Sequence, residues 1–458
     1  MRSKANSFQN ILNSKWFYVY IWLLLIIIGA GVLYLRYPYA FSAPNFYGED
    51  GNVIYENLYN KGFIGALFSR FNGYLIFFQY LVGYASYLTN TVFGGHLYTL
   101  PKAVSIVSYI TFSVACSLPW LLFKNKLGSI ITILTVVLLW FTPFGRSDLA
   151  VLGTIGNLKF LFFYVACLLI IYRNDKSLVP NKSKKIYVID IFLLGCVLTN
   201  ILVVALLPLA LLRYKNILLK IYKYKNIKLL TNNYEILSLF IISLTSIIYV
   251  ITMYVMGIPK MPGYLDGALR FNGLVNSLFR SSWYGIIYPV YTTMNIITVV
   301  GLLSLLPLGL LIKKHRAVYV IVLWGIAISS LGFVLNRPGV TEFFESYTAD
   351  GGPGQFFYAG TMIFVFGLMY LVHEKFKSVN KFFKLLTVYF FAIYFVWAIP
   401  FAGERAQSYK IYSSRPTSYQ SIQTACKNSN NTGPVTFKIY PAEGWNMTIK
   451  KDIACQGL

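Results

Sequence analysis

The residues best suited to do chemistry form a short acidic cluster after the first apolar stretch. Glu49, Asp50 and Glu56 are three of only 15 carboxylates in the chain, and glycines flank the first two. A neighbouring negative charge and partial removal from water both raise a carboxyl pKa, so such a pair can act as a general base. A structural role is the alternative: Asp50 would cap a helix that begins at Asn52, and Glu49 would favour its dipole. The two roles can coexist.

The apolar composition of the chain indicates which elements must hold this cluster in place. Hydrophobic residues make up 57% of the 458 positions and charged residues only 12%, far more apolar than an average soluble domain. Runs such as 16–35 and 237–256 reach the roughly 20 residues that a membrane-spanning helix needs. Because the runs do not alternate in polarity, they predict helices, which satisfy their own backbone hydrogen bonds in lipid.

We therefore expect an all-α polytopic membrane protein, a bundle of about 9–12 transmembrane helices with short or re-entrant helices among them. The predicted apolar segments are 16–37, 74–92, 101–123, 128–145, 150–172, 187–212, 235–258, 286–312, 317–335, 354–373 and 382–402. Residues 187–212 have basic flanks on both sides, which predicts a hairpin of two short helices that breaks near Thr199 and Asn200. Residues 72–92 either dip into the outer leaflet, with Lys124 and Lys126 inside, or cross and leave these lysines outside.

Charge predicts the orientation of the chain in the membrane. The formal net charge of +25 would suggest nucleic acid in a soluble protein, but here the basic residues cluster in short connections between apolar segments, so we expect no nucleic-acid partner. The positive-inside rule assigns these connections and the N-terminus to the cytoplasm. The first apolar segment lacks a small-residue cleavage site and is interpreted as a retained helix. The connections that then lie outside are residues 38–71, 257–285, 336–353 and 403–458.

The C-terminal tail is the second extracytoplasmic feature. Residues 1–402 are predicted to form the membrane domain and residues 403–458 a small appendage, in which Val435 to Tyr440 alternate like a short strand. Three cysteines lie in apolar segments, whereas Cys426 and Cys455 both lie in the tail. A disulfide between these two is expected outside the cytoplasm, and two free thiols are the alternative.

The acidic cluster and the segment that follows it resemble those of a known class of enzymes. A Glu49–Asp50 pair in the first outer loop, followed about twenty residues later by Phe71-Asn72-Gly73-Tyr74-Leu75, resembles the GT-C class of membrane glycosyltransferases, and within it the bacterial and phage serotype-converting glucosyltransferases. Weaker similarities lie in residues 148–159, 198–213 and 440–445. The chain departs from the pattern at Leu158 and Lys159, where many members have His or Trp, and at Gln355, where Arg is usual.

The resemblance implies transfer of a sugar, a hexose such as glucose, from a polyprenyl-phosphate donor to a cell-surface glycan on the outer face of the bacterial plasma membrane. Glu49 or Asp50 would deprotonate the acceptor hydroxyl as it attacks, and the anomeric carbon would be inverted. The candidates for binding sugar or acceptor are Glu56, Asn72, Tyr74 and Asn157. Some members of the class use a divalent cation, Mg²⁺ or Mn²⁺, at the acidic pair, and that alternative stays open here. A donor synthase and a flippase would be partners.

A departing phosphate needs positive charge. Arginine binds two phosphate oxygens at once, although an arginine near a helix end also anchors in lipid headgroups. A lysine inside an apolar segment, such as Lys159, is unfavourable unless it snorkels or meets an anion. The candidates for donor-phosphate binding are Lys159, Arg270, Arg280, Arg337 and Arg405.

Two other functions remain open from the sequence. One is a polyprenyl-linked glycan polymerase or ligase. The other is a lipid-linked sugar flippase or transporter, which would depend on charges near the middle of the membrane rather than on Glu49 or Asp50. We find no internal sequence repeat, and this weakly disfavours transport.

Overall fold

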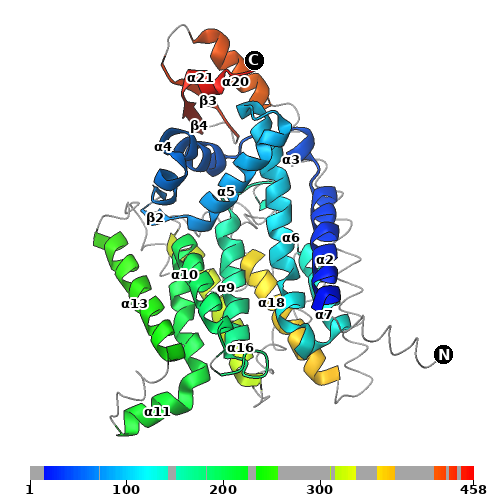
Figure 1. The fold of residues 1–458 in the computed structure, drawn as a ribbon, viewed down its shortest axis with the longest axis vertical. Coiled ribbons are helices and arrows are strands. Elements are labelled where there is room, and N and C mark those ends of the chain that lie inside the picture. Colours follow the sequence, from blue (N-terminus) through cyan, green and yellow to red (C-terminus); the bar gives the residue numbers. More distant parts are fainter. Residues whose placement is uncertain are drawn as a thin grey trace, which may run out of the picture.

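The computed structural model describes residues 15–71, 73–142, 151–181, 183–224, 234–255, 310, 315–336, 358–376, 417–429, 433–440 and 445–458. Most of these residues form helices that run along one axis, and the C-terminal residues lie together at one end of the resulting bundle (Figure 1). We call this the tail end. The opposite end, where Lys126 contacts Asp175 and the basic helix α11 (Lys215–Tyr224) lies, is called the basic end.

Helix α2 (Lys15–Arg36) packs along α6 (Leu100–Leu127), and α7 (Ser129–Trp140) follows after a turn at Gly128. Polar side chains link α2 to α6: the hydroxyl of Tyr18 donates to the carbonyl of Trp120 at 2.7 Å, and Trp22 Nε1 donates to Ser117 Oγ at 2.9 Å. The helix α2 therefore belongs to the folded bundle, while its outer face keeps large apolar side chains exposed.

Between α2 and α6 the chain forms short elements at the tail end. They are α3 (Tyr39–Ser42), the π-helix η1 (Asp50–Tyr55), α4 (Glu56–Leu67), β1 (Arg70–Phe71), β2 (Tyr74–Leu75), α5 (Phe77–Asn90), η2 (Thr91–Phe93) and η3 (Leu97–Thr99). Strands β1 and β2 pair in an antiparallel hairpin.

Helix α5 does not cross the bundle. Its 14 residues span about 21 Å, less than a hydrocarbon core of about 30 Å. It runs from β2 toward the tail end beside α6 (Figure 1). Of the two interpretations of residues 72–92, the one in which the segment does not cross is the one that fits this short helix.

The middle of the chain supplies α9 (Leu158–Asn174), α10 (Lys185–Thr199), the 3-10 helix η5 (Ile201–Tyr214), α11 and α13 (Tyr234–Val255). The predicted hairpin in 187–212 is confirmed, because α10 ends at Thr199 and the side chain of Asn200 accepts a hydrogen bond from the amide of Leu202 at 3.1 Å. The single helix predicted over 150–172 is wrong near its start: residues 152–157 are not helical, and α9 begins at Leu158.

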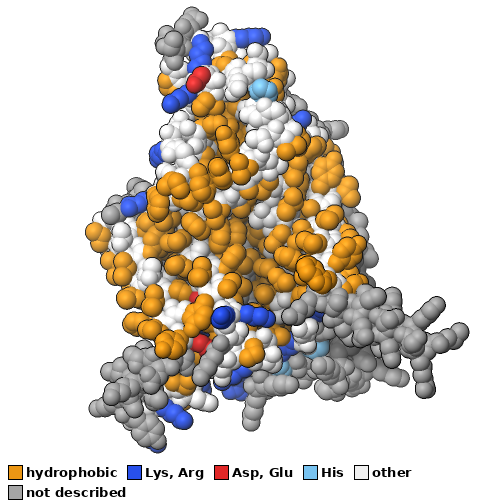
Figure 2. Space-filling model, viewed as in Figure 1, with side chains coloured by type: hydrophobic (Ala, Val, Ile, Leu, Met, Phe, Trp, Pro, Cys, Tyr) orange, Lys and Arg blue, Asp and Glu red, His pale blue; other side chains and the backbone are white. Residues whose placement is uncertain are grey.

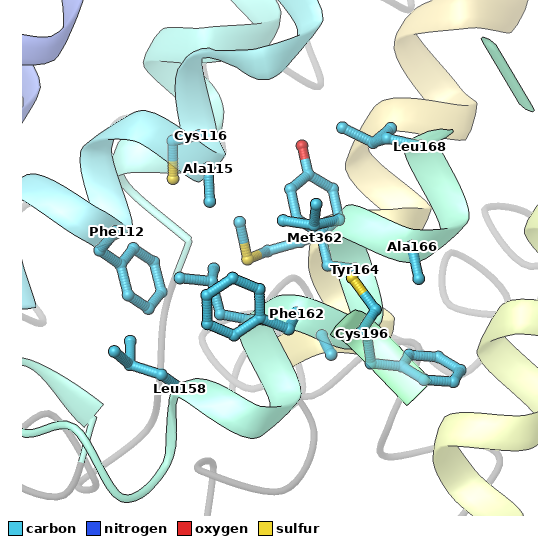
Figure 3. Close-up of a cluster of buried hydrophobic side chains, with 14 of the residues drawn as sticks. Phe112, Ala115, Cys116, Leu158, Phe162, Tyr164, Ala166, Leu168, Cys196 and Met362 are labelled. Atoms are coloured by element: carbon cyan, nitrogen blue, oxygen red, sulfur yellow. The ribbon is translucent and has the colours of Figure 1, made fainter. Parts of the chain in front are cut away.

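Helices α16 (Arg316–Asn336) and α18 (Tyr358–Phe376) correspond to the predicted segments 317–335 and 354–373 and pack against α9. Helix α9 lies at the centre of the bundle, because nearly all of its side chains are buried. Figure 3 shows how Phe112 of α6, Phe162 and Tyr164 of α9 and Met362 of α18 meet in this core. The predicted segments 286–312 and 382–402 lie almost wholly outside the described residues.

A buried charge network links four of these helices near the basic end. Arg173 of α9 pairs with Asp190 of α10 at 2.6 Å, and both side chains are fully buried. Ser238 of α13 also donates to Asp190, at 2.9 Å, while Arg213 of η5 donates to the carbonyl of Arg173 at 2.7 Å. Because each of these charges has partners, the network stabilises one arrangement of the helices.

The tail forms a small subdomain of α20 (Ser418–Asn428), β3 (Val435–Lys438), β4 (Asn446–Ile449) and α21 (Lys451–Ala454). The predicted strand is present but ends at Lys438, and it pairs with β4 in an antiparallel hairpin whose inward side chains are buried. A disulfide joins Cys426 to Cys455. The remaining cysteines, Cys116, Cys167 and Cys196, are free and buried.

The surface of the bundle is that of a membrane protein. Among the described residues, four helical segments are long and apolar enough to cross a bilayer: Trp16–Arg36, Leu97–Leu127, Ile201–Lys220 and Tyr234–Met253. Figure 2 shows a broad band of hydrophobic side chains between the two ends. The exposed large apolar residues of α2 and α13 include Ile27 and Ile251. So large an apolar surface is unfavourable in water and is expected to face lipid.

Candidate functional site

The acidic cluster lies at the tail end, against the turn that precedes α9. Asp50 was predicted to cap the helix that follows it, and this prediction is wrong, because no side chain caps η1. Instead the Asp50 carboxylate accepts hydrogen bonds from the backbone N–H of Gly156 at 2.6 Å and from that of Ile155 at 3.1 Å. Asp50 therefore satisfies the amides of a distant turn, which are available because residues 152–157 are not helical.

The burial of Asp50 disfavours the ionised form of its carboxyl group. The residue is only 1% exposed, and this burial raises its pKa from 3.8 to about 7, the two amide hydrogen bonds acting in the opposite direction. The neighbouring charge of Glu49 adds to the rise. Both oxygens of Asp50 face the turn, so its main effect is to hold the acidic loop against residues 155 and 156.

Glu49 points to a different partner. Its Oε2 lies 3.2 Å from the ammonium nitrogen of Lys159, and its Oε1 lies 3.4 Å from the same atom. The hydroxyl of Tyr74, on β2, is also 3.4 Å from that nitrogen. The aromatic rings of Phe71 and Phe160 lie 5.3 and 5.5 Å from the ammonium, within the range of a cation–π contact.

Exposure separates the two carboxylates. The side chain of Glu49 is 25% exposed and that of Lys159 is 11% exposed, whereas Asp50 is closed off. Lys159 lies in the first turn of α9, where the positive end of the helix dipole adds to its charge. The arrangement thus offers an accessible carboxylate that can take a proton beside a cationic point that can hold an anion.

The turn that carries Lys159 is fixed from four directions. Donors from α5, α6, α18 and the α10–η5 turn bind four carbonyl groups within residues 154–159. The donors are Ser108 to Thr154 at 2.7 Å, Gln79 to Gly156 at 3.3 Å, Tyr358 to Asn157 at 2.8 Å and Asn200 to Lys159 at 3.0 Å. The positioning role of these residues escaped the sequence analysis, which named only Asn200, as part of a helix break. They could have been identified as polar residues within or beside apolar segments, because such a residue in a membrane protein usually has a polar partner inside the fold.

Gly156 is required by the close approach of the acidic loop. A Cβ atom at this position would lie 2.9 Å from Glu49 Cβ, 3.0 Å from Glu49 Oε2 and 3.2 Å from Asp50 Oδ1. Any larger residue would therefore push both carboxylates from their places.

The structure brings together Glu49, Asp50, Tyr74, Asn157 and Lys159 from the predicted set. Asn157 takes part through its backbone carbonyl, which accepts from Tyr358. Glu56 faces another way: its Oε2 accepts from the backbone N–H of Thr448 in the tail at 2.9 Å. The other predicted residues, Asn72, Arg270, Arg280, Arg337 and Arg405, lie outside the described residues.

The acidic pair is a poor fit for a divalent cation in this arrangement. One carboxylate is bound to two amides and the other to an ammonium group, and Mg²⁺ or Mn²⁺ binds through free oxygen ligands. Within the described part of the chain, no group of three or more His, Cys, Asp and Glu side chains is placed to hold a metal ion. We therefore derive no step through a metal.

The chain matches no protein-family model, no curated protein and no solved structure.

Proposed function

We propose that the chain is an integral membrane glycosyltransferase of the GT-C type, which transfers a sugar from a polyprenyl-phosphate donor to a cell-surface glycan. The observation that carries the proposal is the contact between the accessible carboxylate of Glu49 and the ammonium of Lys159. An acceptor hydroxyl needs a base, and a departing phosphate needs a cation within a few ångströms of it. Both groups stand at the tail end of a bundle that carries a lipid-facing apolar surface.

The proposed reaction is a single displacement. The acceptor oxygen forms a bond to the anomeric carbon while the bond from that carbon to the donor phosphate breaks. The phosphate leaves with the bonding electron pair, and Glu49 takes the proton of the acceptor hydroxyl. The product glycan has the anomeric configuration opposite to that of the donor, because the attack comes from the face opposite the phosphate.

The ion pair suggests how donor binding prepares the base. In the structure the charge of Lys159 is directed at Glu49. A polyprenyl phosphate in the site competes for this ammonium, and the negative charge on its phosphate grows as the bond to the sugar breaks. Glu49 is then released to face the acceptor hydroxyl. Asp50, whose oxygens stay on the amides of residues 155 and 156, keeps the loop in place during this exchange.

The proposed orientation follows from charge. Lys124, Lys126 and the lysines of α11 lie at the basic end, which we assign to the cytoplasm, and the tail end then faces outward. The tail disulfide suits an oxidising compartment. With this orientation in a bacterial plasma membrane, Glu49 would face the outer side, where nucleotide sugars are absent. A separate synthase and flippase would therefore supply the donor, whose sugar is most simply a hexose such as glucose.

The direct test is a transfer assay in liposomes that contain the purified protein. Radiolabelled polyprenyl-phosphate glucose is offered with bacterial cell-surface polysaccharide, and labelled glycan is measured together with released polyprenyl phosphate. A transferase yields the two products in equal amounts, one sugar for each acceptor site. A polymerase or ligase, which needs a donor that carries a longer glycan, would leave the polysaccharide unlabelled, and a flippase would move the donor across the bilayer with no glycan labelled; either outcome contradicts the proposal.

A further inference from the structure

The tail binds the backbone of the acidic loop directly beside Glu49. The amide of Tyr440 donates to the carbonyl of Phe46 at 3.0 Å, and the amide of Gly48 donates to the carbonyl of Tyr440 at 2.5 Å. Tyr47 and Tyr440 thereby form a parallel β-bridge, with their rings 5.7 Å apart. Residues 46–48 are thus held as a strand-like partner of the tail.

The same loop is packed by two tail side chains at its glycines. A Cβ atom on Gly48 would lie 3.0 Å from Cδ2 of the Trp445 ring, and one on Gly51 would lie 2.5 Å from Cδ1 of Ile439. The glycines on either side of Glu49 and Asp50 are therefore the points where the tail approaches most closely. This contact accounts for the glycines that flank the acidic pair in the sequence.

The tail also holds the elements on either side of the loop. Ser418, at the start of α20, accepts from the amide of Phe46 at 2.9 Å. Thr448, on β4, donates its amide to Glu56 at 2.9 Å, and its carbonyl accepts from Asn60 at 3.2 Å. The acidic loop is consequently fixed at both ends by one small subdomain.

That subdomain is closed by the disulfide. Cys426 and Cys455 are 29 residues apart, and the segment between them contains β3, β4, Tyr440 and Trp445. A two-stranded hairpin is marginal by itself, and a subdomain this small needs a covalent link to stay folded. The other three cysteines cannot take part in this disulfide, because they are buried in the bundle.

We infer that the disulfide-closed tail is a positioning element for Glu49, with Trp445 and Tyr440 as the positioning residues, and that opening the Cys426–Cys455 bond lowers transfer by releasing the loop. Two anchors hold Glu49: the tail fixes Gly48 on one side, and Asp50 fixes the other side to the turn before α9. Losing the first anchor leaves Lys159 in place, because that residue is fixed by α9. The inference rests on the proposed transferase function.

The test combines kinetics with a readout that needs no activity. Wild-type protein, Trp445→Ala, Trp445→Phe and the double variant Cys426→Ser/Cys455→Ser are compared in liposomes with polyprenyl-phosphate glucose. Lys438→Ala is the matched control, an exposed side chain on β3 that faces away from the loop. Hydrogen–deuterium exchange of the peptide covering residues 44–58 is measured on the same samples, and on wild-type protein treated with a phosphine reductant.

Trp445→Ala, the double variant and reduced wild-type protein are expected to exchange faster over residues 44–58 and to lose at least tenfold in kcat, with the donor KM changed less than twofold. Trp445→Phe and Lys438→Ala should stay within about threefold of the wild type. Unchanged exchange after loss of the disulfide overturns the inference, and so does faster exchange with wild-type kcat. If wild-type protein itself shows no transfer, the proposed function fails, while the exchange data still decide whether the tail holds the loop.

Discussion

The ammonium of Lys159 lies 3.2 Å from Oε2 of Glu49, across 110 residues of sequence. This contact joins the first turn of a buried helix to a loop at the tail end of the bundle. Neither residue is fully enclosed, whereas the adjacent Asp50 is. The two neighbouring carboxylates therefore differ in their surroundings: Asp50 holds the loop against the turn before α9, and Glu49 is partly exposed beside Lys159, where we propose that substrate binds.

Gly156→Ala is expected to remove most of the transfer activity. The new methyl group would lie 2.9 Å from Glu49 Cβ and would displace both carboxylates. A loss of roughly 1–3 kcal/mol in stability, which is usual for overpacking, should accompany it. Transfer and thermal unfolding in detergent are measured beside Gly31→Ala, a substitution in α2 with open space around it. Equal transfer rates and equal unfolding temperatures for the two variants would show that the close approach of Glu49 and Asp50 to Gly156 is unimportant.

Lys159→Met is expected to weaken donor binding about tenfold or more, since a hydrogen bond to a charged group contributes about 1.5–3 kcal/mol. Lys159→Arg keeps the charge and should bind the donor better than the methionine variant does. Binding is measured by co-sedimentation of radiolabelled polyprenyl-phosphate glucose with proteoliposomes. Lys438→Met, which removes an exposed charge in the tail, is the control. Wild-type affinity in Lys159→Met would remove Lys159 from the donor site.

The pKa of Asp50 predicts a pH dependence of stability. Burial raises this pKa to about 7 from 3.8, so the folded protein holds the proton more tightly than the unfolded chain does. The stabilisation by this proton is complete below the unfolded pKa and is lost as the pH rises through about 7. The melting temperature of the wild type should therefore fall between about pH 5.5 and 8 more steeply than that of Asp50→Asn, which cannot titrate.

The control for this comparison is Asp452→Asn, an exposed carboxylate in α21. Its melting temperature should follow the wild-type slope. Parallel slopes for wild type and Asp50→Asn would mean that Asp50 does not take up a proton in this range.

The position of α5 can be tested by labelling single cysteines. Val92 follows α5 and is 81% exposed, and Ser177 lies in the loop after α9. If α5 does not cross the membrane, Val92→Cys reacts in intact cells with a membrane-impermeant maleimide, whereas Ser177→Cys reacts only after permeabilisation. The native free cysteines are buried and give little background. Labelling of both from the same side would contradict the arrangement of α5 and α6.

The general architecture could be predicted from the sequence because its physical causes are local. Uninterrupted apolar runs predict helices, and basic flanks together with Asn200 predict the break between α10 and η5. Alternating polar and apolar residues predict strand β3 of the tail, although they do not predict that it pairs with β4. The start of α9 was misplaced because Gly153 and Gly156, which mark a turn, were included in the apolar run.

The site could be predicted only in part. Glu49, Asp50 and Lys159 stood out by charge, but their pairing depends on where α9 begins and on which turn faces the loop. The capping role of Asp50 was assigned to its own helix because local rules cannot know of free amides about 105 residues away. The contacts of Tyr440 and Trp445 with the acidic loop depend equally on tertiary packing, and within that loop only the glycines beside Glu49 and Asp50 reflect them in the sequence.

The most direct test of the central claim is the rate of sugar transfer by Glu49→Gln in proteoliposomes, at equal protein level and saturating donor. The amide keeps the shape of the side chain but cannot accept the hydroxyl proton, so kcat should fall by about a hundredfold or more, the usual contribution of a general base. Donor binding should persist, and Asp452→Asn should transfer at the wild-type rate. Wild-type kcat in Glu49→Gln would contradict the assignment of Glu49 as the base.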